Sequence, residues 1–310
     1  MRTAFINELI VQARQHPEIF LIVGDLGFSV IEPFASEFPD RFLNAGIAEQ
    51  NMTGVAAGLA SEGYHVFTYS IANFPTLRCL EQIRNDICYH NLPVTVVAVG
   101  GGLAYGNLGY SHHAVQDIAI LRTMPNLTLL APGDPGETKE CVSWLSINPR
   151  PSYLRIGKAG EKSLHEVRGI DGIPLLVRPG TTDIALVSTG GILDETLAAA
   201  DILSKDGLMA PVYSMPWLKP LSPSSLSILA PYRALVAVEE HVPQGGLAGA
   251  LRENLPHSVP IHSISVSESI SSMVGSQSFL RNESGITSNH IESVFRHALI
   301  QWRSFQLPTP

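Results

Sequence analysis

Glu49 is the residue of this sequence whose type and surroundings point most directly to proton chemistry. It stands in the segment FLNAGIAEQNMTGVAAGLASEGY, residues 42–64, whose other members are mostly small or apolar. Small residues let another backbone or a ligand approach closely on more than one side, which predicts a buried helix; they are Ala45, Gly46, Ala48, Gly54, Ala56, Ala57, Gly58 and Ala60. A buried carboxylate is costly unless a specific partner meets it. Glu49 is therefore either a local helix cap or a group held for chemistry.

Two glycine-rich stretches, GGGLAYG at 100–106 and GGLAGA at 245–250, could suggest a dinucleotide-binding loop. Neither is a clean GxGxxG between a first strand and its helix, followed by an acidic residue about 20 positions later. The sequence also contains no GxxxxGK[ST] segment. These motifs argue against a nicotinamide enzyme and against a P-loop nucleotide enzyme.

The composition limits the partners of this chain. At 310 residues, two domains are the default expectation. Charged residues make up 15%, where roughly 25% is typical of soluble domains. This favours an obligate protein partner, although a charge-poor monomer would show the same composition. The net charge of −8 argues against nucleic acid or an anionic membrane as the main ligand.

The cysteines and the first residues indicate the compartment. Cys79, Cys88 and Cys141 form no CxxC pair and show no metal-ligand spacing, which fits buried thiols in a reducing compartment. The first residues form an amphipathic helical pattern over 3–15, without the apolar core of a signal peptide. No run approaches the roughly 18 to 20 apolar residues of a membrane helix. We therefore expect a cytoplasmic protein, and no metal ligand set within this chain.

Helical and strand patterns alternate along the chain and predict an α/β fold of two doubly wound domains. In the first series we expect helices at 3–15, 47–64, 75–91, 115–125 and 134–147, and strands at 19–25, 65–70, 92–101, 127–132 and 151–156. A polar stretch with several Gly and Pro residues follows, and a second, smaller series begins with TDIALVSTGG. The predicted organisation is a first domain at 1–160, a linker at 161–181 and a second domain at 182–310.

Several motifs together resemble the transketolase-like, thiamine-diphosphate-dependent enzymes. These are AGIAEQNMTGVAAGLASEGY, an aromatic strand end, RCLEQIRNDI, and GYSHHAVQDIAILRTMPNLTLLAPGDPGE. They are similar to the pyrimidine-binding domain of that family, and VAVEEHVPQGGLAGAL is similar to its C-terminal domain. The resemblance covers essentially all 310 residues, and it implies one pyrimidine-binding domain followed by one transketolase C-terminal domain.

For Glu49 the resemblance implies a catalytic role. In this family the carboxylate of the GIAEQ motif hydrogen-bonds N1′ of the cofactor's aminopyrimidine and favours the imino tautomer that removes the C2 proton. Burial against apolar walls suits that role, because the carboxyl group must hold or share a proton. The alternative is that Glu49 only caps its helix. An aminopyrimidine also needs an aromatic face, and we expect Phe74, then Tyr69 or Phe67, to supply it, unless they are plain core residues.

The resemblance also implies substrate-binding residues. His112 occupies the place of a histidine that faces the substrate, whereas His113, which cannot share its face of the chain, is expected to be structural. The further candidates, each of which could equally be a solvated surface group, are Arg155, Lys158, Arg2 and Ser29 for a sugar phosphate and Asp25 for a carboxylate near the cofactor.

Two positions depart from the family pattern on the acceptor side. An acidic residue that reads sugar hydroxyls is Leu108 here, and a histidine farther upstream is Gly100. Recognition of the acceptor is thus less well supported than recognition of the donor.

A larger departure concerns the diphosphate. Members of the family hold it through Mg²⁺, using a GDG motif and a downstream Asn on a separate domain, and VGDLG, PGDPG and IDG do not stand in that context here. We therefore expect the chain to be the C-terminal subunit of a split transketolase, in which an N-terminal subunit with the GDG domain holds thiamine diphosphate and Mg²⁺ (or Ca²⁺) in an α₂β₂ heterotetramer.

The expected reaction is transfer of a two-carbon ketol unit from a ketose or ketose phosphate donor to an aldose acceptor. Three alternatives remain open on the sequence alone. They are the β subunit of a 2-oxoacid dehydrogenase, a synthase of the deoxyxylulose-phosphate type, and a non-catalytic scaffold paralogue. Retention of Glu49, an aromatic cluster and His112 argues against the scaffold.

Overall fold

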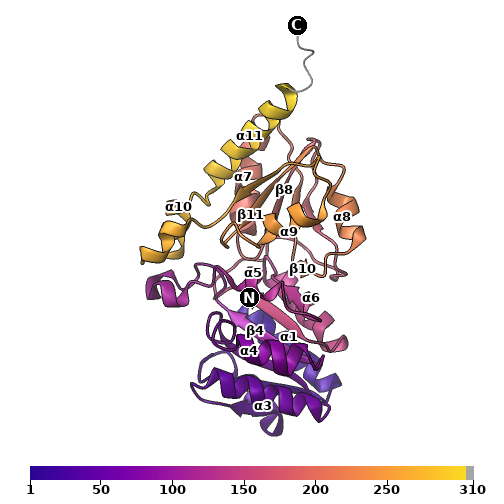
Figure 1. Ribbon diagram of the computed structural model, residues 1–310, viewed down its shortest axis with the longest axis vertical. Coiled ribbons are helices and arrows are strands. Elements are labelled where there is room, and N and C mark those ends of the chain that lie inside the picture. Colours follow the sequence, from indigo (N-terminus) through magenta and orange to yellow (C-terminus); the bar gives the residue numbers. More distant parts are fainter. Residues whose placement is uncertain (305–310) are drawn as a thin grey trace.

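The computed structural model describes residues 1–304, which form two α/β lobes (Figure 1). Each lobe is built on its own mainly parallel sheet, of seven strands in the first and five in the second. The predicted α/β class with two domains is confirmed. The predicted C-terminal limit at 310 lies outside the described residues.

The first sheet has the strand order β10-β5-β6-β4-β3-β1-β2. Its strands are β1 (Ile19–Val23), β2 (Phe42–Asn44), β3 (His65–Ile71), β4 (Val94–Val99), β5 (Thr128–Leu130), β6 (Ser152–Ile156) and β10 (Trp217–Lys219). All pairings are parallel except that of β10 with β5. The β-branched runs of β3 and β4 are buried almost throughout, as expected for central strands covered on both faces.

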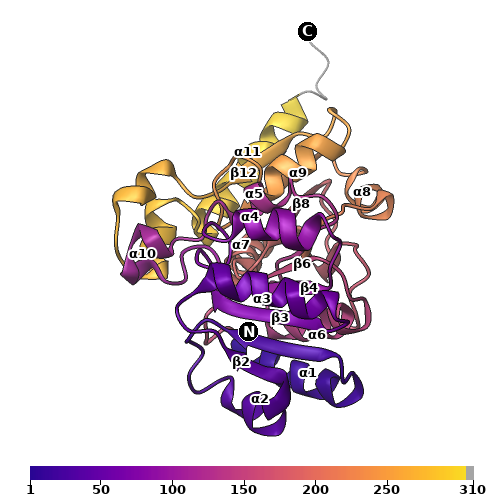
Figure 2. The same ribbon diagram turned by 60° about the horizontal axis from the view of Figure 1, so that its bottom comes forward.

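Helices cover both faces of this sheet (Figure 2). They are α1 (Arg2–Gln15), α2 (Glu32–Glu37), α3 (Glu49–Ser61), α4 (Leu80–Gln82), α5 (Asp117–Leu121) and α6 (Pro135–Ile147). The helices α1 and α6 pack together on one face, while α3 and α4 lie on the other. The side chain of Asp134 caps α6 by accepting a hydrogen bond from the Glu137 amide at 2.8 Å. A helix was expected at 75–91, but this segment contains only the short α4, followed by a π-helical stretch at Ile83–Cys88.

The small-residue helix α3 is buried on one side only. Met52, Thr53 and Ala56 face the sheet, whereas Gly54 and Gly58 have open space where a side chain would stand. The predicted burial thus holds for the sheet side of α3 and does not hold for its glycine side. The exposed glycine side is suited to close approach by another backbone.

The second sheet has the order β12-β11-β8-β9-β7. Its strands are β7 (Leu175–Arg178), β8 (Ile184–Thr189), β9 (Val212–Ser214), β11 (Ala234–Glu239) and β12 (Ile261–Ile264). The accompanying helices are α7 (Leu193–Lys205), α8 (Pro223–Leu229), α9 (Leu247–Asn254), α10 (Gln277–Glu283) and α11 (Ser288–Ser304). In the core of this lobe, α7 and α11 pack together against the central strands.

The boundary between the two lobes is less simple than the predicted linker suggests. Residues 161–181 include β7, which adds to the second sheet as an antiparallel edge strand. From the second series, β10 returns to the first sheet, where Trp217 packs edge-on against Trp144 of α6 with ring centroids 4.6 Å apart. Because β10 crosses into the first sheet, the lobes are joined more closely than a plain linker would join them.

Within residues 1–304, no helix combines the length and the apolar character that crossing a membrane requires.

Candidate active site

Glu49 is the first residue of α3, and its side chain is only 1% exposed. It does not cap the helix, because the N-cap residue is Ala48, which has no side-chain cap hydrogen bond. Its carboxylate instead accepts a hydrogen bond from Arg78, whose Nη1 lies 2.5 Å from Oε2. The helix N-terminus adds a positive partial charge beside the carboxylate. Glu49 therefore makes no side-chain cap hydrogen bond to its own helix, and its charge is met by Arg78 and by the helix N-terminus.

The chain brings Glu49 to the carboxyl edge of the parallel sheet. Gly24 directly follows β1, and a Cβ placed there would lie 3.6 Å from Cγ of Glu49 and 3.3 Å from Oγ of Ser70 near the end of β3. The carboxyl ends of parallel strands are the usual binding edge of open α/β sheets. The acid thus lies where this class of fold binds its ligands.

Of the three aromatic candidates, only Phe74 lies on the surface of this region. It is partly exposed, and the guanidinium carbon of Arg78 lies 5.0 Å from its ring centroid. Phe67 and Tyr69 are 0% exposed and pack against Phe5 of α1, on the opposite face of the sheet from α3. Alternate residues of a strand point to the same face, so both belong to the core beneath α1. The expectation that either could stack on a ligand is corrected.

His112 faces Phe74 across the site, with the two ring centroids 5.2 Å apart. It ends the short 3₁₀ turn Tyr110–His112, is half-buried, and pairs through Nδ1 with Ser111 Oγ at 2.9 Å. Burial lowers the pKa of His112, so the imidazole is neutral at neutral pH. The side-chain amide of Asn73 donates to the carbonyls of Ser111 and His113 and holds this turn beside Phe74.

His113, by contrast, is buried, with Nε2 3.5 Å from the carbonyl oxygen of Gly106. A cavity of about 330 Å³ opens beside Phe74 and His113. Its lining comprises Asn73, Phe74, Leu77, Arg78, Tyr110, Ser111, His113 and Gln116.

The glycine triplet 100–102 is explained by the side chains that press against its backbone. A Cβ at Gly100 would lie 2.1 Å from the Tyr105 ring, one at Gly101 2.6 Å from Arg155, and one at Gly102 2.3 Å from Glu240. Gly100 and Gly102 also have φ of +78° and +70°, where only glycine is free of strain. The triplet is thus a tightly packed turn beneath the site.

Arg155 does not reach the site surface. Its side chain is 4% exposed, its Nε lies 2.8 Å from Oδ2 of Asp117, and its Nη2 donates to the carbonyls of Ala114 and Glu240. Burial alone would lower the pKa of Arg155, but the adjacent Asp117 carboxylate raises it. Its Nε and Nη2 thus hold the floor of the site together, and a contact of Arg155 with a substrate phosphate stays a prediction.

The other phosphate candidates remain accessible. Lys158 is exposed, with Nζ 4.8 Å from the centroid of Tyr105. Arg2 is half-buried beside Tyr69 and Tyr105, and its buried Nε has no hydrogen-bond partner among the described residues.

Ser29 and Asp25 are exposed residues of the loop after β1, with φ of +66° and +52°. The Ser29 amide donates to Glu32, while Asp25 accepts a hydrogen bond from the Asn44 side chain.

Two residues of the site were missed from the sequence. Arg78 is the side-chain partner of Glu49, although 29 positions separate them. Tyr105 fills the space above Gly100, at 6.4 Å from the ring of His112. The spacing of four between Phe74 and Arg78 was the one available signal, since it is typical of neighbours on a helical turn.

One group of residues has the proximity of a metal site among residues 1–304. It consists of Asp134, Glu137 and His165. Its carboxylate oxygens already accept from the amides of Glu137, Leu164 and Gly133 and pair with the His165 ring at 2.8 Å. The cluster therefore fastens the start of the linker to α6.

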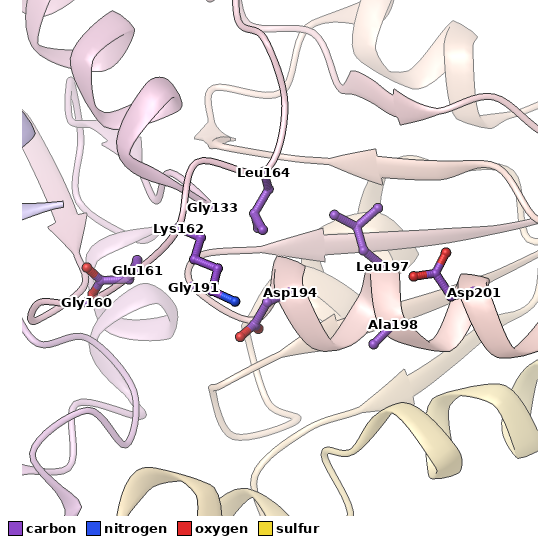
Figure 3. Close-up of a pocket in the computed structure, with 10 residues that line it drawn as sticks. All are labelled: Gly133, Gly160, Glu161, Lys162, Leu164, Gly191, Asp194, Leu197, Ala198 and Asp201. Atoms are coloured by element: carbon purple, nitrogen blue, oxygen red, sulfur yellow. The ribbon is translucent and has the colours of Figure 1, made fainter.

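A larger cavity, of about 440 Å³, lies between residues 160–164 and α7 (Figure 3). Asp194, Ala198 and Asp201 line it from α7, and Leu164 lines it from the linker side. None of the candidate site residues lines it. Its larger volume alone therefore does not make this cavity the reaction site.

Large apolar side chains stand exposed on the edge strand β2 and in loops of the first lobe. We call them the apolar rim: Phe28 (69% exposed), Leu43, Ile47 (80%), Leu77, Leu108 (55%) and Tyr110. Exposed apolar groups in this number are typical of a surface that another chain covers.

Comparison with known proteins agrees with this architecture. The family model "Transketolase, pyrimidine binding domain" matches residues 1–160, and "Transketolase, C-terminal domain" matches residues 175–291. The chain is 34% identical over 272 residues to one of the subunits of apulose-4-phosphate transketolase from Phocaeicola vulgatus, covering 86% of each chain. It is 35% identical over 259 residues to "Putative transketolase C-terminal section" of Methanocaldococcus jannaschii, covering 82% of this chain and 81% of that one.

A solved structure shows the same arrangement of both lobes. "Split gene transketolase, inactive beta4 tetramer" superposes with a TM-score of 0.85 at 32% identity, covering 96% of this chain and 97% of that one. The two domain models match in the expected order, and the relatives match over most of their length. Together these matches identify the family. The chain belongs to the transketolase family.

Proposed function

We propose that this chain is the subunit of a split, thiamine-diphosphate-dependent transketolase that holds the pyrimidine end of the cofactor. The observation that carries the proposal is the group formed by Glu49, Phe74 and His112. A buried acid, a partly exposed aromatic ring and a neutral imidazole meet at the carboxyl edge of a parallel sheet. The relatives named above support the division of the enzyme into two chains.

The residues present suit an aminopyrimidine. Glu49 offers a buried carboxyl group for a ring nitrogen, and Phe74 offers an aromatic face beside an open cavity. When bound, thiamine diphosphate supplies a carbon nucleophile that accepts the ketol unit and stabilises its negative charge. Glu49 would hold the proton at the pyrimidine nitrogen, and low solvent access keeps that proton in the site.

His112 would face the sugar substrate. A neutral imidazole can accept a proton from a substrate hydroxyl or donate one to a carbonyl oxygen. Arg78 partly neutralises Glu49, and its own side chain is 45% exposed, so it can move when a ligand arrives. Lys158 and Arg2 are the positive groups left for a substrate phosphate.

The diphosphate end would be held by a second chain. The apolar rim and the exposed glycine side of α3 leave a large surface beside Glu49 uncovered, and an interface that completes an active site would cover it. We therefore assign the GDG motif and Mg²⁺ (or Ca²⁺) to an N-terminal subunit in an α₂β₂ assembly. The solved relative, described as an inactive tetramer of β chains, supports activity only with that partner.

A deoxyxylulose-phosphate synthase is the second candidate. Such an enzyme from Kitasatospora griseola is 31% identical over 256 residues, but this chain covers 39% of its length. The relatives with matching length are parts of transketolases, which favours the ketol-transfer reaction.

The test begins with gentle purification of the chain from its own cells and mass spectrometry of whatever remains bound in stoichiometric amount. We expect a companion chain that carries GDG and a downstream Asn. The reconstituted pair should transfer a ketol unit between sugar phosphates with thiamine diphosphate and Mg²⁺, while the isolated chain binds the cofactor weakly and has no activity. Tight cofactor binding by the isolated chain, or co-purification with a lipoyl-bearing complex, would contradict the proposal.

A further inference from the structure

Tyr105 lies in the loop between β4 and α5, on the same side of the first sheet as His112. Its ring occupies the space above Gly100, because a Cβ at that position would fall 2.1 and 2.2 Å from two of the ring carbons. Gly100 itself has φ of +78°. This backbone therefore accepts glycine alone, and the absence of a side chain at 100 is what lets the ring lie there.

The loop that carries Tyr105 is held on two sides. Gly102 and Ala114 form an isolated antiparallel bridge, and the amide of Gly275 donates to the carbonyl of Gly106 at 3.2 Å. A Cβ at Gly106 would also lie 2.4 Å from Leu280 of α10, so the second lobe presses against this loop. A phenol on such a support is positioned before any ligand arrives, which reduces the entropy lost on binding.

Neighbouring rings and a cationic group link Phe74 to Lys158 through His112 and Tyr105. Phe74 lies 5.2 Å from His112, His112 lies 6.4 Å from Tyr105, and Nζ of Lys158 lies 4.8 Å from the centroid of Tyr105. Arg2 approaches Tyr105 as well. Tyr105 therefore neighbours both the imidazole at the reacting end and the cationic groups that remain for a phosphate.

A phosphorylated sugar in its open form has the same order of groups, with a carbonyl at one end, a phosphate at the other and hydroxyls between. Residues 100–113 contain no carboxylate that could read those hydroxyls. We propose that Tyr105 contacts a hydroxyl of an open-chain sugar phosphate, midway between the carbonyl carbon at His112 and the phosphate at Lys158, and so sets the sugar specificity of this enzyme. The inference rests on the proposed function and adds the residue that reads the substrate.

The chemical state of Tyr105 suits this contact. Burial raises the pKa of Tyr105, so the phenol is protonated at neutral pH and can donate a hydrogen bond. Leu108 of the same loop is exposed and apolar, and Glu161, a carboxylate that acts on the phenol, is paired with the N-terminal amine at 2.9 Å.

The experiment pairs a protein change with a substrate change, in the reconstituted complex with its partner subunit. Tyr105→Phe removes only the hydroxyl, and Tyr64→Phe, a tyrosine that packs on Phe20, is the matched control. Each complex is assayed with an aldose phosphate and with analogues that lack one hydroxyl each. Tyr105→Phe should lower kcat/KM for the full sugar about threefold to tenfold through KM, as expected for one lost hydrogen bond. For the analogue that lacks the contacted hydroxyl, the variant and the wild type should be equal.

Cofactor affinity is measured in the same complexes and should not change. Equal kcat/KM of Tyr105→Phe and wild type for every sugar would overturn the inference, as would an equal loss for all analogues or a loss of thiamine diphosphate affinity. If the wild-type pair turns over no sugar phosphate, the proposed function fails and the inference falls with it. If the wild type is active and Tyr105→Phe behaves identically, only the inference fails.

Discussion

Two buried glutamates, Glu49 and Glu239, lie at the carboxyl edges of the two sheets and differ in how their charge is met. Both Glu239 oxygens accept backbone amides at the start of α9, from Leu247 at 2.6 Å and from Ala248 at 3.0 Å. The carboxylate of Glu49 accepts no backbone amide within residues 1–304, and its partner is the half-exposed Arg78. The carboxylate of Glu239 is committed to holding a helix. That of Glu49 remains available to a ligand that can displace or join Arg78.

Of the changes considered for these acids, Glu49→Gln should have the largest effect, and the effect should be on turnover. The amide cannot hold or release the proton, so kcat of the reconstituted enzyme should fall about 10²- to 10⁴-fold, the usual contribution of a positioned acid or base. The melting temperature and the assembly with the partner should be unchanged, because no backbone contact depends on the carboxylate. Glu62→Gln, at the exposed end of α3, is the control. Unchanged turnover in Glu49→Gln would favour a non-catalytic scaffold.

A buried acid paired with a buried cation should behave in the opposite way, and Asp117 provides that case, because its Oδ2 pairs with the buried Arg155. Asp117→Asn leaves the buried guanidinium of Arg155 without its counter-charge and weakens the hydrogen bond from Tyr153, which donates to the same oxygen at 2.6 Å. The free energy of unfolding should fall by about 3 kcal/mol. Urea denaturation measures it, and Glu166→Gln, from an exposed pair with Arg168, should change it by less than about 1 kcal/mol. If stability is retained while KM for sugar phosphates rises, Arg155 would be a phosphate ligand after all.

Glu239 yields a prediction with a defined pH window. Burial raises the pKa of Glu239 to about 7, against the two amides that lower it. The folded state therefore holds this proton more tightly than the unfolded state, whose carboxyl groups titrate near about 4.3. The stability from the protonated group is fully present below that value and is lost as the pH rises through about 7.

The measurement is the difference in unfolding free energy between wild type and Glu239→Gln at several pH values. The unfolding free energy of the wild type, minus that of Glu239→Gln, should fall by up to about 3 kcal/mol between about pH 4 and pH 7, because Gln does not titrate. A constant difference over this range would show that folding does not raise the pKa of this carboxyl group.

Local patterns were enough to predict much of the fold but only part of the site. The strand periodicities and the helix predicted at 134–147 depend on near neighbours, and the structure has these elements close to where they were expected. The buried pairing of Arg155 was not predicted, because its partner Asp117 is 38 positions away. The return of β10 to the first sheet and the meeting of Arg78 with Glu49 are likewise long-range pairings that no local pattern encodes. The mutual fit of Gly100 and Tyr105 spans only five positions, yet it depends on a turn geometry that neither residue type specifies alone.

The smallest predicted effect compares two phenylalanines, one at the site and one in the core. Phe74→Leu should weaken thiamine diphosphate binding to the reconstituted complex about threefold to tenfold, the value of one aromatic contact, and should leave stability nearly unchanged because the ring is partly exposed. Phe67→Leu should lower the free energy of unfolding by about 1 to 2 kcal/mol and leave cofactor affinity unaltered, because its ring packs on Phe5 beneath α1. Cofactor titration and urea denaturation of both variants provide the four values. Reduced cofactor affinity in Phe67→Leu without reduced stability would mean that the core beneath α1 is coupled to the cofactor site. Glu49 and Glu239 divide into one acid available to a ligand and one that holds the structure, and the two phenylalanines would then not divide in the same way.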